Sequence, residues 1–449
     1  MATSLRQTMD SAPISPLQWR VATMLTCVFL LEGMDFQSAA YSAPILMTMW
    51  HLGKLQFSPL LAAAAIGMAI GTIGGSWAAD RYGRKPTLTA SVAFFGLLTI
   101  VCAGANGPNT FMLVRFVSGL GFGAAFPTAI AMMGEWMPRR AAPKAVSVMT
   151  IGIPGGIILG AIVAGWFLPN FGWRWFFVAV GSACVLFSLL LLTALPESPS
   201  YLVLRGRQAE LRGLLGRAWG SAITLSHGPF ELARLEQRSN GLLKPKQRRT
   251  SIGLWVASLA ANLGTYTMGA WLTVVLTGFK LPLVTALRGP ITYSSFAILG
   301  GLSVGWVISR LGTRAAMLSL VAIGFAGAAF VSLAIAMVPM GSSLLIALFG
   351  GLAVIGLSIG ALLPAAYVVA ASAYETEVRS RGVGVMSAIG RVGSILSGFL
   401  GGAILASAPP SAFFALIAGL IAVIGIGVLV INHHVARLGY VDRAKPISP

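Results

Sequence analysis

Long apolar segments recur along the whole chain at nearly regular spacing, separated by short polar connections. Each segment has about 20 residues with few charges, the length that an α-helix needs to cross the hydrocarbon core of a bilayer. The pattern predicts twelve transmembrane helices, over roughly residues 21–43, 57–79, 87–105, 110–133, 145–168, 174–195, 251–276, 285–308, 315–337, 343–371, 383–405 and 411–432. We therefore expect an all-α membrane protein.

The longest polar stretch divides the chain into two halves with six predicted helices each. It predicts an N-terminal bundle over residues 1–195, a cytoplasmic linker over 196–250 and a C-terminal bundle over 251–449. Two short connections occupy equivalent places in the halves, namely S-W-A-A-D-R-Y-G-R at Ser76–Arg84 and G-W-V-I-S-R-L-G-T-R at Gly305–Arg314. The pattern indicates two pseudo-symmetric six-helix bundles. Repeated halves of this kind are typical of transporters in which one half rocks against the other.

The charge of the chain indicates membrane orientation rather than a nucleic-acid partner. The net charge is +19, and 25 of the 31 Lys and Arg residues lie in alternate connections on one side of the predicted topology. This asymmetry marks the cytoplasmic side of a membrane protein, so we expect both termini and the linker there. Cys27, Cys102 and Cys184 all lie within apolar segments. We therefore expect no disulfide framework, no metal site and no cofactor.

Two of the 12 acidic residues, Glu32 and Asp35, lie inside a predicted transmembrane helix. A charge at the bilayer centre costs ~2.5–3.5 kcal/mol even on insertion scales, so such residues are candidates for function. Residues three apart share a helix face, so both carboxyls are expected to point into one cavity and to carry protons. No histidine lies in a predicted span. The alternative is a structural pairing of these acids with buried arginines.

Arg115 and Arg391 are the basic residues best placed inside predicted spans. Two arginines and two acids form a neutral set, which lowers the cost of burial. The planar guanidinium suits bidentate binding of a carboxylate. We expect Arg391 to contact a substrate carboxylate, with a structural ion pair as the alternative, and Arg115 to act with the acids in proton coupling.

Aromatic and amide side chains in the second half are candidate walls of a binding pocket. Asn262 and Tyr266 lie four residues apart and share a helix face. Trp is also enriched at membrane interfaces, which is the default interpretation for two of the candidates. The full set is Trp255, Asn262, Tyr266, Trp271, Tyr293 and Tyr367, of which Trp255 and Trp271 are the expected interfacial anchors.

Several short motifs carry a resemblance to a known family. They are D-R-Y-G-R-K at Asp80–Lys85, R-F-V-S-G-L-G-F-G at Arg115–Gly123, P-E-S-P at Pro196–Pro199, E-T-E-V-R at Glu375–Arg379 and G-R-V-G at Gly390–Gly393. E-G-M-D at Glu32–Asp35 is similar to an acidic D-G-x-D motif, with Glu in place of the first Asp. On these motifs the chain resembles the major facilitator superfamily, and within it the aromatic acid:proton symporter family.

The resemblance implies a symporter in the plasma (inner) membrane that imports a small aromatic carboxylate, benzoate- or hydroxybenzoate-like, together with protons by alternating access. It also implies a cytoplasmic charge cluster that latches neighbouring helices in one conformation, made of Asp80, Arg81, Arg84, Glu135 and Arg139. The expected partners are the acid, protons and lipid, and we expect a monomer.

Two alternatives keep the fold and change the transport. One is a proton-driven exporter, suggested by the glycine-rich I-P-G-G at Ile153–Gly156, although helix packing explains this run equally well. The other is a symporter for a non-aromatic organic anion or a sugar. An enzyme is not expected, because no nucleophile–His–acid set lies at membrane depth. Duplicated halves also fit alternating access better than a channel.

Overall fold

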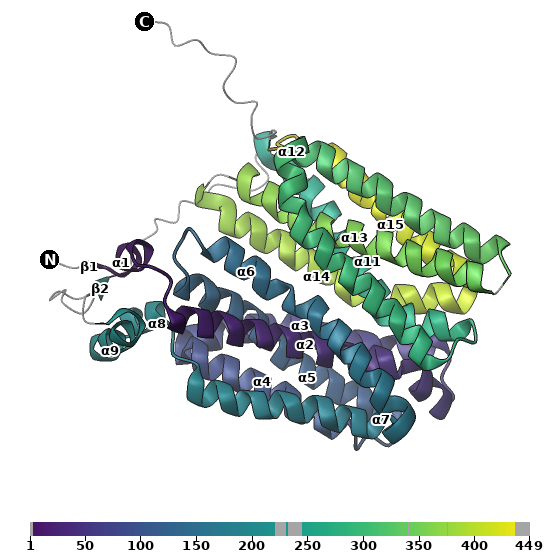
Figure 1. Ribbon diagram of the computed structural model, residues 1–449, viewed down its shortest axis with the longest axis horizontal. Helices are drawn as coiled ribbons and strands as arrows, with labels where there is room; N and C mark the ends of the chain where they lie inside the picture. The colour runs from purple at the N-terminus through teal and green to yellow at the C-terminus, as the bar shows by residue number, and fades with distance from the viewer. Residues whose placement is uncertain (1–2, 221–229, 232–244, 340, 375, 436–449) are drawn as a thin grey trace, which may run out of the picture. The chain divides into compact units, whose positions relative to one another are not determined.

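The computed structural model describes residues 3–220, 230–231, 245–339, 341–374 and 376–435. Nearly all of this part of the chain is helical, and within each compact unit the long helices run alongside one another (Figure 1). One unit contains residues 1–39 and 63–235, and the other contains residues 40–62 and 236–449. The prediction of an all-α membrane protein is confirmed, apart from one pair of two-residue strands.

The first unit contains most of the elements that precede the predicted linker, together with three elements that lie within it. Its strands β1 and β2 pair in parallel, with Thr3 opposite Phe230. Its helices pack chiefly through α4, which lies against both α5 and α7. The elements are β1 (Thr3–Ser4), α1 (Leu5–Ser11), the greater part of α2 (Pro16–Met49) and of α3 (Lys54–Tyr82), α4 (Arg84–Cys102), α5 (Pro108–Trp136), α6 (Ala142–Thr150), α7 (Gly152–Ala194), α8 (Pro199–Leu204), α9 (Gln208–Trp219) and β2 (Phe230–Glu231).

The second unit contains the helices that follow the linker, together with the end of α2 and the beginning of α3. Here α12 packs against α13 and α15, and α11 packs against α14 and α15. Aliphatic side chains, including Leu254, Met317 and Val369, form its core. The helices are α11 (Pro245–Gly278), α12 (Leu283–Met337), α13 (Ser342–Ala373), α14 (Thr376–Ser407) and α15 (Pro410–Val430).

The twelve predicted spans fall on ten long helices, because α7 and α12 each contain two of them. Gly172 in α7 has a φ of 79° and Gly312 in α12 has a φ of 76°, and these non-helical residues break each helix between its two spans. Glycine adopts such angles without a steric penalty. By length and composition, nine of the described helices could cross a membrane, or ten if α1 and α2, bent by 101°, count as one.

Close contact between α2 and α7 holds the acidic part of α2 in place. A Cβ atom at Gly33 would overlap the backbone of Ile153, and one at Gly156 would overlap the backbone of Leu30. Small residues at such positions let transmembrane helices approach closely. Gly33 therefore serves helix packing, as do Gly156 in the glycine-rich run of α7 and Gly152 just before that run.

In the second unit, the connection between α2 and α3 packs against the end of α14. Lys54 Nζ donates a hydrogen bond to the carbonyl of Leu405 at 2.9 Å. Nearby, Trp271 Nε1 donates to the carbonyl of Gly398 at 3.0 Å, and the Trp271 side chain is fully buried. The prediction of Trp271 as an interfacial anchor is therefore wrong. Gly401 on α14 has no side chain, and this leaves room for the indole inside the unit.

Candidate functional site

Asp35 of α2 forms hydrogen bonds with side chains of α4 and α5 inside the first unit. Its side chain is fully buried. Thr99 of α4 shares its one hydroxyl proton between the two carboxylate oxygens, with Oγ1 at 2.8 and 2.7 Å from them, and Arg115 of α5 donates from Nη1 to Oδ1 at 3.1 Å. Three helices thus contribute one side chain each to a buried polar site.

Arg115 also binds the backbone of α2. Its Nη2 donates to the carbonyl of Asp35 at 3.1 Å and to the carbonyl of Phe36 at 2.9 Å. The guanidinium carbon lies 5.9 Å from the ring centre of Phe122, and the side chain is 1% exposed. Burying a charge without a partner is strongly unfavourable, whereas a hydrogen-bonded pair can be accommodated. Arg115 therefore neutralises Asp35 and fixes α5 to α2.

Glu32 is buried as well, with 3% of its surface exposed. It lies on α2 one turn before Asp35, next to Gly33 at the contact with α7. The structure thus buries both predicted acids within the first unit and brings Arg115 to Asp35. This ion pair is common to the coupling interpretation and to the structural alternative.

In the second unit, Asn262 of α11 lies against α14. Its Nδ2 donates to the carbonyl of Ser258 at 2.8 Å, and a Cβ at Gly390 would contact that same amide. Arg391 follows Gly390 directly and is half-buried. Tyr266 is also half-buried, one turn beyond Asn262 on α11. The contact between α11 and α14 thus places an amide beside the helix turn that carries Arg391.

The two remaining predicted tyrosines occupy different surroundings in this unit. Tyr293 of α12 is buried, and its side chain forms a hydrogen bond with that of Thr265 on α11. Tyr367 of α13 is partly buried against the core of the unit, as is Trp255. The side chains of Glu377 and Arg379, and Glu375 entirely, lie outside the part of the chain that the structure describes.

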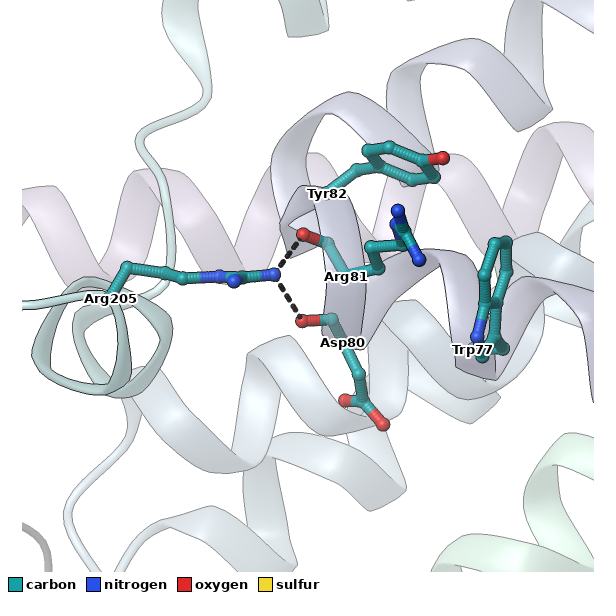
Figure 2. Close-up of a pocket in the computed structure, with 5 residues that line it drawn as sticks. All are labelled: Trp77, Asp80, Arg81, Tyr82 and Arg205. Atoms are coloured by element: carbon teal, nitrogen blue, oxygen red, sulfur yellow. Dashed lines mark hydrogen bonds between the residues drawn. The ribbon is translucent and has the colours of Figure 1, made fainter.

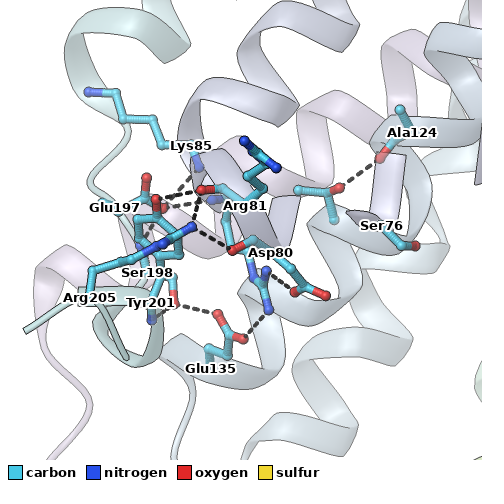
Figure 3. Close-up of polar contacts among 12 residues, drawn as sticks. Ser76, Asp80, Arg81, Lys85, Ala124, Glu135, Glu197, Ser198, Tyr201 and Arg205 are labelled. Atoms are coloured by element: carbon cyan, nitrogen blue, oxygen red, sulfur yellow. Dashed lines mark hydrogen bonds and ion pairs between the residues drawn. The ribbon is translucent and has the colours of Figure 1, made fainter. Parts of the chain in front are cut away.

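Most residues of the predicted charge cluster are connected to one another in the first unit (Figure 3). Arg84, at the beginning of α4, bonds Asp80 of α3 at 2.5 Å and Glu135 of α5 at 3.2 Å. The other oxygen of Glu135 accepts a hydrogen bond from the hydroxyl of Ser198, which precedes α8. One guanidinium therefore links two acids from different helices.

Glu197 belongs to this cluster, although the sequence did not single it out as a site residue. Its Oε1 accepts hydrogen bonds from the backbone N–H groups of Arg84 and Lys85, at 2.9 and 3.0 Å. Those groups form the N-terminus of α4, where unpaired donors and the helix dipole favour an anion. Gly83, with a φ of 115°, leaves the space that the carboxylate occupies. The P-E-S-P motif was the available signal.

Arg81 lies at the edge of the cluster, in an open pocket of about 560 Å³ lined by Trp77, Asp80, Arg81, Tyr82 and Arg205 (Figure 2). Its guanidinium lies 5.4 Å from the ring centre of Trp77 and 5.7 Å from that of Tyr82. Arg205 donates to the main-chain carbonyls of Arg81 and, at 3.5 Å, Asp80. Arg205 thus ties the segment after α8 to the end of α3.

The structure places Arg139 away from these contacts. Its backbone N–H donates to Asp10 Oδ1 at 2.7 Å, and its Nε lies 3.7 Å from Asp10 Oδ2. Arg139 was expected in the charge cluster with Asp80, Arg84 and Glu135, and the contact observed for it is with Asp10 instead. Asp10 belongs to α1, a short helix that the hydrophobic pattern does not predict. Among the described residues, no group of three His, Cys, Asp or Glu side chains could hold a metal ion.

Comparisons with known proteins give the same family for most of the chain. The sequence model of the Major Facilitator Superfamily matches residues 25–337. The chain is 29% identical over 405 residues to the 4-hydroxybenzoate transporter PcaK of Acinetobacter baylyi, and 30% identical over 402 residues to the gallate transporter of Pseudomonas putida. Each alignment covers 88% of this chain and 87% of the relative.

The fold is similar to that of solved membrane transporters. The inward-open xylose transporter XylE from E. coli superposes with a TM-score of 0.72 at 18% identity, over 93% of this chain and 97% of XylE. A bacterial homologue of the lysosomal transporter Spinster gives a TM-score of 0.69 at 15% identity. At these identities the similarity concerns the fold.

Proposed function

This chain belongs to the Major Facilitator Superfamily, and on that premise we propose that it is a proton-coupled symporter that imports a small aromatic carboxylate by alternating access. It is a multi-pass membrane protein and not an enzyme, as its relatives and its apolar helices indicate. We place it in the plasma (inner) membrane with both termini in the cytoplasm, as a monomer.

The observation that carries the proposal is the buried contact among Asp35, Arg115 and Thr99 in the first unit. An ionisable residue at membrane depth that is paired with an opposite charge is typical of proton relays in transporters. When Asp35 is ionised, its carboxylate holds Arg115. Protonation removes that charge and weakens the link between α2 and α5, so proton loading changes the relative stability of two conformations.

Two lines of support give the substrate class. The relatives named above transport 4-hydroxybenzoate and gallate, both aromatic acids. In the second unit Arg391 offers the planar donor set that suits a carboxylate, and Asn262 lies against the neighbouring Gly390. We assign substrate contacts to Arg391, Asn262, Tyr266, Tyr293 and Tyr367.

The charge balance decides how far the membrane potential contributes. One proton moving with a monovalent acid transfers no net charge, so the pH gradient alone drives accumulation. A second proton, for which Glu32 is the candidate carrier, would add one charge and ~2.3 kcal/mol per 100 mV. We further propose that the cluster of Asp80, Arg81, Arg84 and Glu135 stabilises one of the two conformations.

Purified protein in proteoliposomes tests the coupling. With an acidic exterior, the wild-type protein is expected to concentrate radiolabelled 4-hydroxybenzoate or gallate. Asp35→Asn is expected to lose gradient-driven accumulation and to retain exchange of labelled for unlabelled acid, because exchange needs no net proton movement. Glu210→Gln is the matched control, since Glu210 lies outside the predicted spans and forms an exposed ion pair with Arg207.

Three outcomes would contradict the proposal. Accumulation by Asp35→Asn at the wild-type level would remove the coupling role of Asp35. Accumulation only under the reversed pH gradient would identify an exporter. Transport of a sugar or an aliphatic acid in preference to both aromatic acids would overturn the substrate class.

A further inference from the structure

We propose that Thr99 is the positioning residue of the Asp35 site, and that its hydroxyl serves Asp35 in both protonation states, as donor to the carboxylate and as acceptor from the protonated acid. The inference rests on the proposed proton coupling through Asp35 and adds a residue that no motif of the sequence marks. Thr99 lies on α4, is fully buried and touches both oxygens of the carboxylate.

The first argument comes from the direction of the Thr99 side chain. Buried Ser and Thr residues in helices usually donate to the carbonyl four residues earlier in their own helix. This chain follows the rule at the buried Ser91 and Thr128 and at the partly buried Thr26, Thr72 and Thr265, at distances of 2.7–2.8 Å. Thr99 instead makes both of its hydrogen bonds across the helix contact, to Asp35 of α2.

The second argument comes from the chemistry of the partners. Protonated Asp35 carries an O–H group, which needs an acceptor when it is buried. Arg115 has donors only and cannot supply one. Among the described side chains that form a hydrogen bond with the Asp35 carboxyl, Thr99 is the one with lone pairs to offer.

Reversing the direction of one hydrogen bond between Thr99 and Asp35 therefore lets the site take up a proton while Thr99 stays bound to the carboxyl group. Protonation weakens the bond from Arg115 to the carboxyl group, while the two bonds from its Nη2 to main-chain carbonyls of α2, which do not titrate, remain. Among the described residues, the other ionisable groups that interact electrostatically with Asp35 are Cys102 on α4 and Cys184 on α7, and Glu32 lies one turn away on α2 itself.

Thr99→Val tests the proposal, because valine keeps the shape of threonine and removes the hydroxyl. Valine removes the hydrogen bond in both protonation states, but the bond to the ionised carboxylate is the stronger one, so the ionised form loses more. We expect the pH midpoint of gradient-driven uptake to move to higher pH by about one unit, a tenfold change in proton affinity. Thr99→Ser keeps the hydroxyl and is expected to titrate as the wild type does.

Thr128→Val is the matched control, since Thr128 is buried in the same unit and bonds the carbonyl of Ala124 in its own helix. Its midpoint is expected to stay at the wild-type value. Infrared difference spectroscopy of the carboxyl band, assigned with Asp35→Asn, measures the protonation directly and does not depend on transport. Thermal unfolding of each variant in detergent establishes that it is folded.

The outcomes separate this inference from the function on which it rests. If wild-type protein shows no gradient-driven uptake, the proposed function fails, while the infrared titration still tests Thr99. If Thr99→Val titrates as wild type, moves to lower pH, or shifts no further than Thr99→Ser, the role of Thr99 is refuted. A shift confined to Thr99→Val supports it.

Discussion

At the scale of single residues, Asp35 and Arg115 depend on one another for their burial. Removing the arginine leaves a buried carboxylate that must be neutralised or hydrated, and removing both charges takes away that need. Broken buried ion pairs commonly lose 3–5 kcal/mol of stability, roughly, whereas apolar replacements of the whole pair are often tolerated. The pair thus sets the structure of the first unit as well as its chemistry.

We expect Arg115→Leu to lower the free energy of unfolding by about 3–5 kcal/mol, because it leaves Asp35 unpaired. Asp35→Asn combined with Arg115→Leu is expected to regain most of that loss, since no buried charge remains. Chemical unfolding of the detergent-solubilised protein measures both values. A double variant as unstable as Arg115→Leu would show that the loss comes from the carbonyl contacts of Arg115 instead.

The sequence predicts the charged members of this site and misses the neutral one. Glu32, Asp35 and Arg115 stand out because charges are rare in apolar helices. Thr99 has no such signal, because a hydroxyl in a helix is normally satisfied by its own backbone. Only the contact of α4 with α2 shows that this threonine points elsewhere. Glu197 is similar, since its role depends on the N-terminus of another helix.

At the scale of helices, the contact between α2 and α7 gives a direct test of packing. Gly156→Ala is expected to destabilise the protein by about 1–3 kcal/mol, because the added methyl group overlaps the backbone of Leu30. Gly155→Ala is the adjacent control, with no atom within 4 Å of the added Cβ. Alanine there should be neutral or stabilising, by up to about 1 kcal/mol.

Thermal unfolding midpoints of the two variants, measured in the same detergent, provide the comparison. Equal midpoints for Gly155→Ala and Gly156→Ala would contradict close packing at this contact. Uptake by Gly156→Ala is expected to fall together with stability, because the same contact holds Glu32 and Asp35 in register.

The length of the apolar segments predicts the long helices well. A segment that crosses the hydrocarbon core must satisfy its backbone polar groups internally, which a helix does. Segment length does not predict where one helix ends in a chain of continuous apolar segments, so α7 and α12 each join two spans at a glycine. It also misses α1, whose seven residues are too few for a periodic signal. The position of Arg139 beside Asp10 follows from that helix.

At the scale of the whole molecule, the distribution of Lys and Arg predicts which connections face the cytoplasm. His51 and Arg207 are both exposed and lie in connections on opposite sides of the predicted topology. In a variant without native cysteines, His51→Cys is expected to react with a membrane-impermeant maleimide in intact cells. Arg207→Cys is expected to react only after permeabilisation. The reverse pattern would invert the orientation.

The hydrogen bond between Lys54 and Leu405 joins residues 351 positions apart. A ribosome that adds about 5–20 residues per second needs roughly 18–70 s to make that interval. The turn between the first two long helices is therefore synthesised long before its acceptor. Until nearly the last helix has been made, Lys54 lacks its hydrogen bond to Leu405. The order of translation makes the earliest inserted hairpin one of the last parts of the protein to reach its native contacts.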